Sequence, residues 1–156
     1  MGADAWRRHT NPWSVYTRFL SMPLLGVAIW SREWIGPWFL IVVALTILWI
    51  WINPRLFPVP TSTDNWASKA VLGERIWLRR KVTPVPRHHA NAAMFLAAIS
   101  GIGALLFAYG LIALDPLMLS LGLVVALLSK AWFLDRSVWL FEDMMHTSAD
   151  YRDWLY

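Results

Sequence analysis

Long uncharged stretches alternate with short polar segments along this chain. The uncharged runs 34–54 and 90–114 are each long enough to cross the hydrocarbon layer as a helix, which takes about 20 residues. Two shorter apolar stretches reach that length if Arg18 and Lys130 extend their side chains toward the lipid headgroups. The pattern predicts an all-α integral membrane protein with four spans, at about 15–31, 35–53, 91–114 and 116–134.

Short polar turns join the predicted spans in pairs. Arg32 and Glu33 lie between the first two spans, and Asp115 lies between the last two, where it suits the N-cap of a helix that begins at Pro116. We therefore expect two helical hairpins that form one four-helix bundle, within a single domain over 1–156. Small residues at four-residue spacing in the third span predict close packing there, namely Ala93, Ala97 and Gly101.

The segment between the hairpins, 64–80, has the spacing of an amphipathic cytoplasmic helix that lies on the membrane surface. Its apolar positions fall within one arc: Trp66, Ala67, Ala70, Val71, Trp77 and Leu78. The polar side chains of Ser68, Arg75 and Arg79 fall opposite, where they would face water or lipid headgroups. A further cytoplasmic helix is expected to extend the fourth span over about 135–148.

One acidic residue departs from this amphipathic pattern. Glu74 falls within the apolar arc, where an unpaired carboxylate would be costly. One explanation is an ion pair with Arg18 or with Lys81. The other is a polar or ligand-binding site between the loop helix and the ends of the spans, formed by Glu74, Arg75 and Arg18.

Lys and Arg residues are distributed very unevenly about the predicted spans. Of the 14, Arg32 alone lies at a predicted outer turn. By the positive-inside rule, both termini and the middle loop face the cytoplasm. The net charge of +4 therefore indicates membrane topology, and we expect no nucleic-acid partner. Most of the 12 tryptophans fall at the predicted interfaces, as in an aromatic belt, the alternative being stacking on a flat cofactor.

The absence of cysteine excludes thiolate metal sites, so any metal must be held by histidines and carboxylates. His88 and His89 precede the third span, and Asp135, Glu142 and His146 follow the fourth on one stripe of a continuing helix. These five residues are the candidate metal ligands, and Asp143 with His146 would give a second pair. The alternative is a solvated helix end in which Asp135 pairs with Arg136 or Lys130.

Several short stretches together resemble a family of small, Trp-rich bacterial integral membrane proteins of unknown function. They are His9-Thr10-Asn11-Pro12-Trp13-Ser14, Asn53-Pro54-Arg55-Leu56-Phe57, Asp64-Asn65-Trp66-Ala67-Ser68-Lys69, Gly73-Glu74-Arg75 and Phe133-Leu134-Asp135-Arg136. The similarity runs over most of the chain. It implies a multi-pass protein of the bacterial inner membrane and implies no activity.

Three functions are compatible with these features. The first expectation is a non-catalytic accessory, assembly or structural subunit, which implies the lipid bilayer and either a membrane protein partner or a homo-oligomer. The second is a metal- or cofactor-dependent enzyme with a His and carboxylate site on the cytoplasmic face. The third is a protein that binds a lipid or another hydrophobic ligand. The spans hold no acid or base at mid-depth, which argues against transport by this chain alone.

Overall fold

The structure is a computed structural model that describes residues 2–156, and it confirms the all-α prediction because those residues contain no strand. The first half of the chain forms α1 (Ala3–His9), α2 (Pro12–Phe19), α3 (Ser21–Trp30), α4 (Arg32–Ile35), the 3-10 turn η1 (Gly36–Trp38) and α5 (Phe39–Leu56). The second half forms α6 (Trp66–Leu78), α7 (Arg87–Ala113), α8 (Pro116–Met144) and α9 (Ala149–Arg152).

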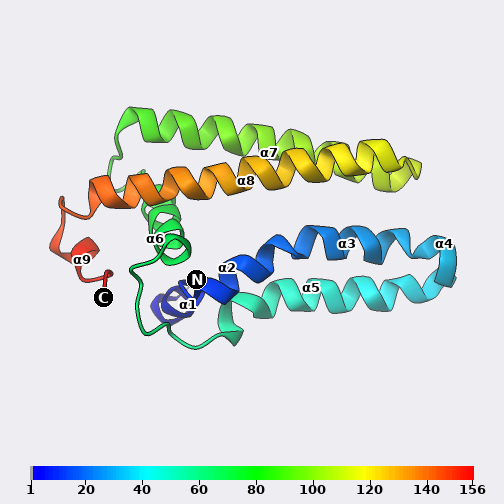
Figure 1. Ribbon diagram of the computed structural model, residues 1–156, viewed down its shortest axis with the longest axis horizontal. Coiled ribbons are helices and arrows are strands. Elements are labelled where there is room, and N and C mark those ends of the chain that lie inside the picture. The colour runs from blue at the N-terminus through cyan, green and yellow to red at the C-terminus, as the bar shows by residue number, and fades with distance from the viewer. Residues whose placement is uncertain (1) are drawn as a thin grey trace.

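The chain from α2 to α5 folds back on itself, and we call this unit the first hairpin. α3 and α5 run antiparallel side by side, and α4 and η1 form the turn between them (Figure 1). Gly36 has φ +54° and ψ −138°, a backbone conformation that side chains with a Cβ rarely adopt, which explains a glycine at this turn. Asn11 caps the start of α2 by accepting a hydrogen bond from the Trp13 amide at 3.0 Å.

α7 and α8 form the second hairpin (Figure 1). The Asp115 carboxylate accepts hydrogen bonds from the amides of Leu117 and Met118 at 2.9 and 3.1 Å, as the predicted N-cap requires. The helices approach closely at Gly103, Gly110 and Gly122, where an added Cβ would come within 2.5 Å of a backbone atom of the facing helix. The predicted packing stripe was wrong at Gly101, because a Cβ there would lie in open space among the residues described.

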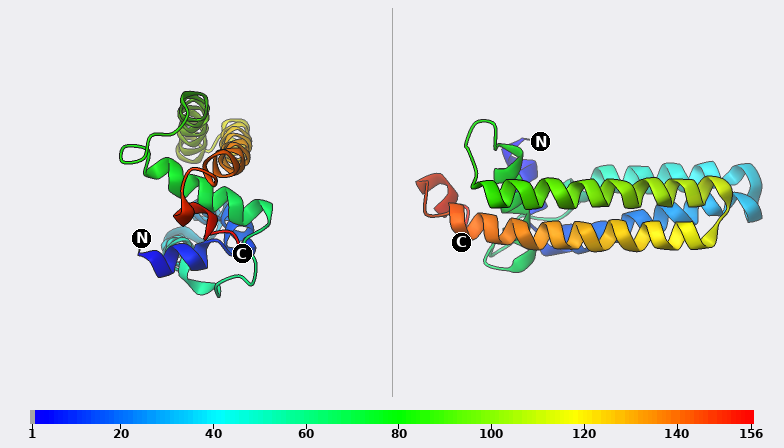
Figure 2. Two further views of the ribbon diagram at one scale, coloured as in Figure 1. Left: turned by 90° about the vertical axis from the view of Figure 1, so that its left-hand side faces the viewer. Right: turned by 90° about the horizontal axis from the view of Figure 1, so that it is seen from above.

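The helix α6 crosses between the two hairpins at the end of the molecule that carries both termini, as the end-on view in Figure 2 shows. A helix was predicted here, but its burial was predicted incorrectly. Leu72 and Ile76 are buried, and so is Ser68, which was expected to face water or headgroups. The cause is contact on several sides, since α6 packs against both α8 and α2.

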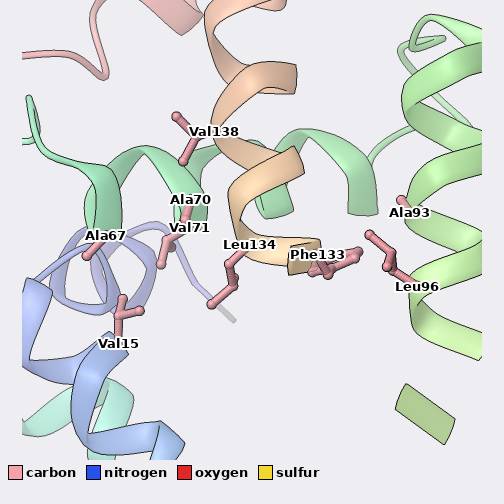
Figure 3. Close-up of a cluster of buried hydrophobic side chains, with 9 residues drawn as sticks. All are labelled: Val15, Ala67, Ala70, Val71, Ala93, Leu96, Phe133, Leu134 and Val138. Atoms are coloured by element: carbon pink, nitrogen blue, oxygen red, sulfur yellow. The ribbon is translucent and has the colours of Figure 1, made fainter. Parts of the chain in front are cut away.

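The main hydrophobic core lies where α2, α6, α7 and α8 meet (Figure 3). Its buried members are Val15, Ala67, Ala70, Val71, Ala93, Leu96, Phe133, Leu134 and Val138. Toward the opposite end, Gly26 of α3 lies against the Phe107 ring of α7, which a Cβ at Gly26 would approach to 3.0 Å. At that far end the Arg32 guanidinium also donates a hydrogen bond to the carbonyl oxygen of Leu111. The two hairpins therefore make direct contact toward this far end, and α6 joins them at the opposite end, where it packs against α2 and α8.

Among the described residues, three helical stretches are long and apolar enough to cross a membrane: Pro12–Leu56, Arg87–Ala113 and Pro116–Met144. The first of these includes the turn of the first hairpin. Large apolar side chains on these stretches are exposed, including Leu105 and Ile112 at 73% and 78%. Soluble monomers rarely expose so much contiguous apolar surface, so this surface suits contact with lipid.

Candidate functional site

A chain of hydrogen-bonded polar side chains, with its buried part at His9, Ser14 and Asn53, joins α1, α2 and α5 next to the core. Arg18 lies 2.7 Å from Nε2 of His9, and Nδ1 of His9 lies 3.0 Å from the Ser14 hydroxyl. The Ser14 hydroxyl donates to Oδ1 of Asn53 at 3.1 Å, and Nδ2 of Asn53 donates to the Thr17 hydroxyl at 2.7 Å. His9, Ser14 and Asn53 are all buried, so the network satisfies groups that water does not reach.

The directions of these hydrogen bonds fix the protonation of His9. A guanidinium has no acceptor, so Arg18 donates and Nε2 of His9 must carry a lone pair. The remaining ring proton therefore lies on Nδ1, which donates a hydrogen bond to the Ser14 hydroxyl. The Ser14 hydroxyl in turn donates a hydrogen bond to Asn53. Burial lowers the pKa of His9 to about 3, and the charges of Arg18 and Lys130 act in the same direction. The imidazole is therefore neutral at physiological pH.

Next to this network lies a cavity of about 230 Å³ between the two hairpins, which we call the interhairpin cavity. Its charged end is formed by Arg18, Glu74 and Lys130, together with neutral His9. Its apolar walls come from both hairpins: Val15, Phe19, Met22, Val71, Ala104, Ala126, Leu127 and Leu134, with Ser21 and Ser100 as polar members. The cavity thus has an ionic end and an apolar interior.

Glu74 of α6 forms an ion pair with Lys130 of α8 at 3.0 Å. Neither Arg18 nor Lys81, the partners predicted from the sequence, forms this pair. Arg18 is hydrogen-bonded to His9 instead, and the partner of Glu74 is Lys130 of α8. A second cavity of about 250 Å³ adjoins the first and shares Glu74, Ser100 and Lys130 with it. The ion pair therefore borders both cavities.

The structure brings Arg18 and Glu74 together, as the predicted polar site requires, but it places Arg75 elsewhere. The Arg75 guanidinium lies over the Trp154 ring at 4.1 Å and over the Trp6 ring at 5.8 Å. Burial lowers the pKa of Arg75, and the nearby charge of Arg79 adds to this effect. Arg75 therefore anchors α1 and the C-terminal segment to α6.

The predicted metal ligands separate into two groups. His88 and His89 lie beside Asp143. Nε2 of His88 is 4.0 Å from Oδ2 of Asp143, and Nε2 of His89 is 2.7 Å from the same oxygen. The two imidazole rings are 4.1 Å apart between centroids. One ligand atom from each of these three residues lies within 4.8 Å of the others, which is compatible with a shared metal ion.

The other three predicted ligands lie outside this group. Asp135 accepts a hydrogen bond from the Trp66 indole at 3.1 Å, and Glu142 pairs with Lys69 at 3.3 Å. Neither Arg136 nor Lys130 pairs with Asp135 in the described part of the chain. His146 follows the end of α8 and does not join the group that contains His88 and His89.

Sequence reasoning missed His9 and Lys130 as members of the cavity and placed Asp143 in a pair with His146. The interaction of His9 with Asn53 through Ser14 spans distant parts of the chain, so no local spacing reveals it. A signal did exist, since His9, Ser14 and Asn53 all belong to the stretches that carry the family resemblance.

Comparison with known proteins gives a family and no activity. No curated protein and no solved structure matches this chain. A family model matches residues 1–154, which is nearly the whole sequence. The chain therefore belongs to a family of unknown function, DUF6653.

Proposed function

We propose that this protein spans the membrane with both hairpins and binds an anionic amphiphile in the interhairpin cavity. An anionic amphiphile here means a molecule with a negatively charged head and an apolar tail, such as an acidic phospholipid. The observation that carries the proposal is the polarity of the cavity. Its charged end holds more positive than negative side chains, and its interior is lined by apolar residues of both hairpins.

The membrane part of the proposal rests on the exposed surface of the hairpins. The four arms are α3 with the end of α2, α5, α7 and α8, and each is apolar and exposes large side chains, among them Leu24, Leu45, Phe95 and Leu128. Such a surface is stable in lipid and prone to aggregation in water. A helical arm makes its backbone hydrogen bonds internally, as the bilayer requires of a spanning segment.

The orientation part rests on where the charges lie. α1, α6, α9 and both termini gather at one end of the molecule, and the turn around α4 lies at the other end (Figure 1). Arg32 is the single Lys or Arg of the sequence at that other end. The positive-inside rule then places the termini and α6 in the cytoplasm. The family resemblance supports the inner membrane of a bacterium as the location.

The sign of the ligand's charge follows from the groups at the charged end. Arg18 and Lys130 are cations, Glu74 is an anion, and His9 is neutral because burial lowers its pKa to about 3. One positive charge is therefore not balanced within the cavity. A cation would be repelled, and a neutral head would leave this positive charge unpaired, whereas an anionic head would pair with it.

The test is lipid binding by purified protein in nanodiscs or in a mild detergent. Native mass spectrometry with a matched series of phosphatidylglycerol and phosphatidylcholine should show preferential retention of the anionic lipid. Lys130→Gln should weaken this retention because it removes a cation. Glu74→Gln should strengthen it because it removes the competing carboxylate.

The matched control is Arg55→Gln, which removes a cation at the same end of the molecule but outside the cavity. Arg55 is exposed and lies over the Trp51 ring at 4.7 Å. Its loss should leave the lipid preference unchanged. Equal retention of the two lipids by the wild type, or shifts of the same sign in Lys130→Gln and Glu74→Gln, would contradict the proposal.

The expectation of an accessory or assembly subunit stays a prediction. It does not conflict with amphiphile binding, because a lipid-binding subunit can also belong to a larger complex. The interhairpin cavity is the feature that favours the binding function over a purely structural one.

A further inference from the structure

A group of metal-ligating side chains lies outside the interhairpin cavity, where α7 begins and α8 ends. α7 starts at Arg87, so His88 and His89 belong to its first turn, and Asp143 belongs to the last turn of α8. The antiparallel packing of the second hairpin brings these helix ends together. Side chains from two distant parts of the sequence, His88 with His89 and Asp143, thus converge on one point.

We propose that His88, His89 and Asp143 bind a borderline divalent cation such as Zn²⁺. Two imidazoles and one carboxylate are a ligand set that suits this class of ion, and the chain has no thiolate to select a softer one. This site is independent of the interhairpin cavity, and either proposal can fail without the other.

The geometry needs little rearrangement. Two ligand atoms of one tetrahedral Zn²⁺ ion, each at about 2.1 Å from it, lie about 3.4 Å apart. Nε2 of His89 is 2.7 Å from Oδ2 of Asp143, and Nε2 of His88 is 4.0 Å from the same oxygen. The side chains of His88 and Asp143 are 66% and 59% exposed, so they can shift while the buried His89 stays fixed.

The surroundings of the site indicate an exchangeable ion. Three protein ligands leave a tetrahedral position open to water or to another molecule. Nδ1 of His89 is buried and has no hydrogen-bond partner among the described residues, so no outer group orients the ring or raises its basicity. Missing outer-shell partners cost about 10- to 100-fold in metal affinity. We therefore expect micromolar binding at an open site.

The test uses untagged full-length protein in detergent, stripped of metal with a chelator and titrated with Zn²⁺ by calorimetry. The wild type should bind one ion per chain in the micromolar range. His88→Ala and Asp143→Asn should each weaken binding about tenfold or more. Both side chains are exposed, so these variants should fold, and circular dichroism verifies that they do. Co²⁺ in place of Zn²⁺ provides a second readout, because its visible absorption reports the ligand set.

The matched controls are His146→Ala and Glu142→Gln, which remove a neighbouring histidine and a neighbouring carboxylate outside the group. Glu142 pairs with Lys69 and should not contribute to the ion. Both controls should bind like the wild type. The proposal is overturned if the wild type binds no ion, or if the controls weaken binding as much as His88→Ala and Asp143→Asn do.

Discussion

At the residue scale, the buried polar network around His9 has a defined direction. Arg18 donates to His9, His9 to Ser14, Ser14 to Asn53 and Asn53 to Thr17, so every member has a partner. Such a network is stable because each donor faces an acceptor, and it becomes costly when one member is removed or changes its protonation. His9 is the member whose pKa in an unfolded chain, about 6.5, lies close to physiological pH.

The network therefore predicts a loss of stability in mild acid. The pKa of His9 is about 3 in the folded protein and about 6.5 in an unfolded chain. Between these values the unfolded chain binds a proton that the folded protein does not bind. The free energy of unfolding should fall as the pH falls below about 6.5, by up to about 1.4 kcal/mol per pH unit from this group. Chemical unfolding in detergent at pH 4.5 to 7.5 measures this change in the free energy of unfolding.

His9→Gln is the comparison variant for this prediction. Glutamine can accept from Arg18 and donate to Ser14, but it does not titrate. The variant should lose part of the acid dependence and keep a similar stability at pH 7.5. An unchanged pH dependence would show that His9 is not the responsible group and would count against its low pKa.

At the element scale, the position of α6 depends on one close approach to α8. A Cβ added at Gly73 would lie 1.8 Å from the carbonyl oxygen of Ser137, which is backbone and cannot move aside. Gly73 therefore sets the distance at which Ala70 and Val71 reach the core beside Leu134. The same helix carries Glu74 to the interhairpin cavity.

Gly73→Ala should consequently separate α6 from α8 and destabilise the protein by about 1–3 kcal/mol, the usual cost of overpacking. It should also weaken lipid retention in the interhairpin cavity, because Val71, which belongs to the apolar wall of the cavity, moves with the helix. The melting temperature in detergent, followed by circular dichroism, measures the first effect.

Gly101→Ala is the control for this substitution. It makes the same chemical change in a long helix, at a place where the new methyl group meets open space among the described residues. The higher helix propensity of alanine should leave the stability unchanged or raise it by up to about 1 kcal/mol. If both variants lower the melting temperature equally, the contact of α6 with α8 is not the cause.

At the scale of the whole molecule, the two hairpins extend from a wide end that carries α1, α6 and α9 (Figure 2). That end also holds the hydrophobic core and the charged end of the interhairpin cavity. The arms beyond it contribute fewer buried residues, since 6% of the most apolar part of Pro12–Leu56 is buried and 28% of that in each of Arg87–Ala113 and Pro116–Met144. In the proposed membrane location, lipid is the solvent in which such exposed apolar arms are stable.

The proposed orientation predicts a pattern of chemical labelling. The natural chain has no cysteine, so a single introduced cysteine reports its own location without background. A membrane-impermeant maleimide applied to intact bacteria should label Glu33→Cys at the turn of the first hairpin. It should label Thr61→Cys, between α5 and α6, after the membrane has been permeabilised and not before. The reverse pattern would contradict the cytoplasmic placement of the termini and α6.

The sequence by itself determined the features that depend on solvent and on neighbours along the chain. Uncharged runs predicted long apolar helices, because a backbone in lipid must satisfy its own hydrogen bonds. Asp115 before Pro116 predicted the start of α8, because capping depends on residues within one turn. The all-α class followed from the same local patterns.

The tertiary structure alone decided how α6 is buried and which groups meet. The spacing of apolar residues predicts burial on one face of a helix only. Because α6 contacts both α2 and α8, Ser68 on the predicted polar face is buried as well. The pairing of Glu74 with Lys130 and the grouping of His88, His89 and Asp143 depend on distances between helices. Many partners of suitable charge exist along the chain, and packing of the hairpins selects among them.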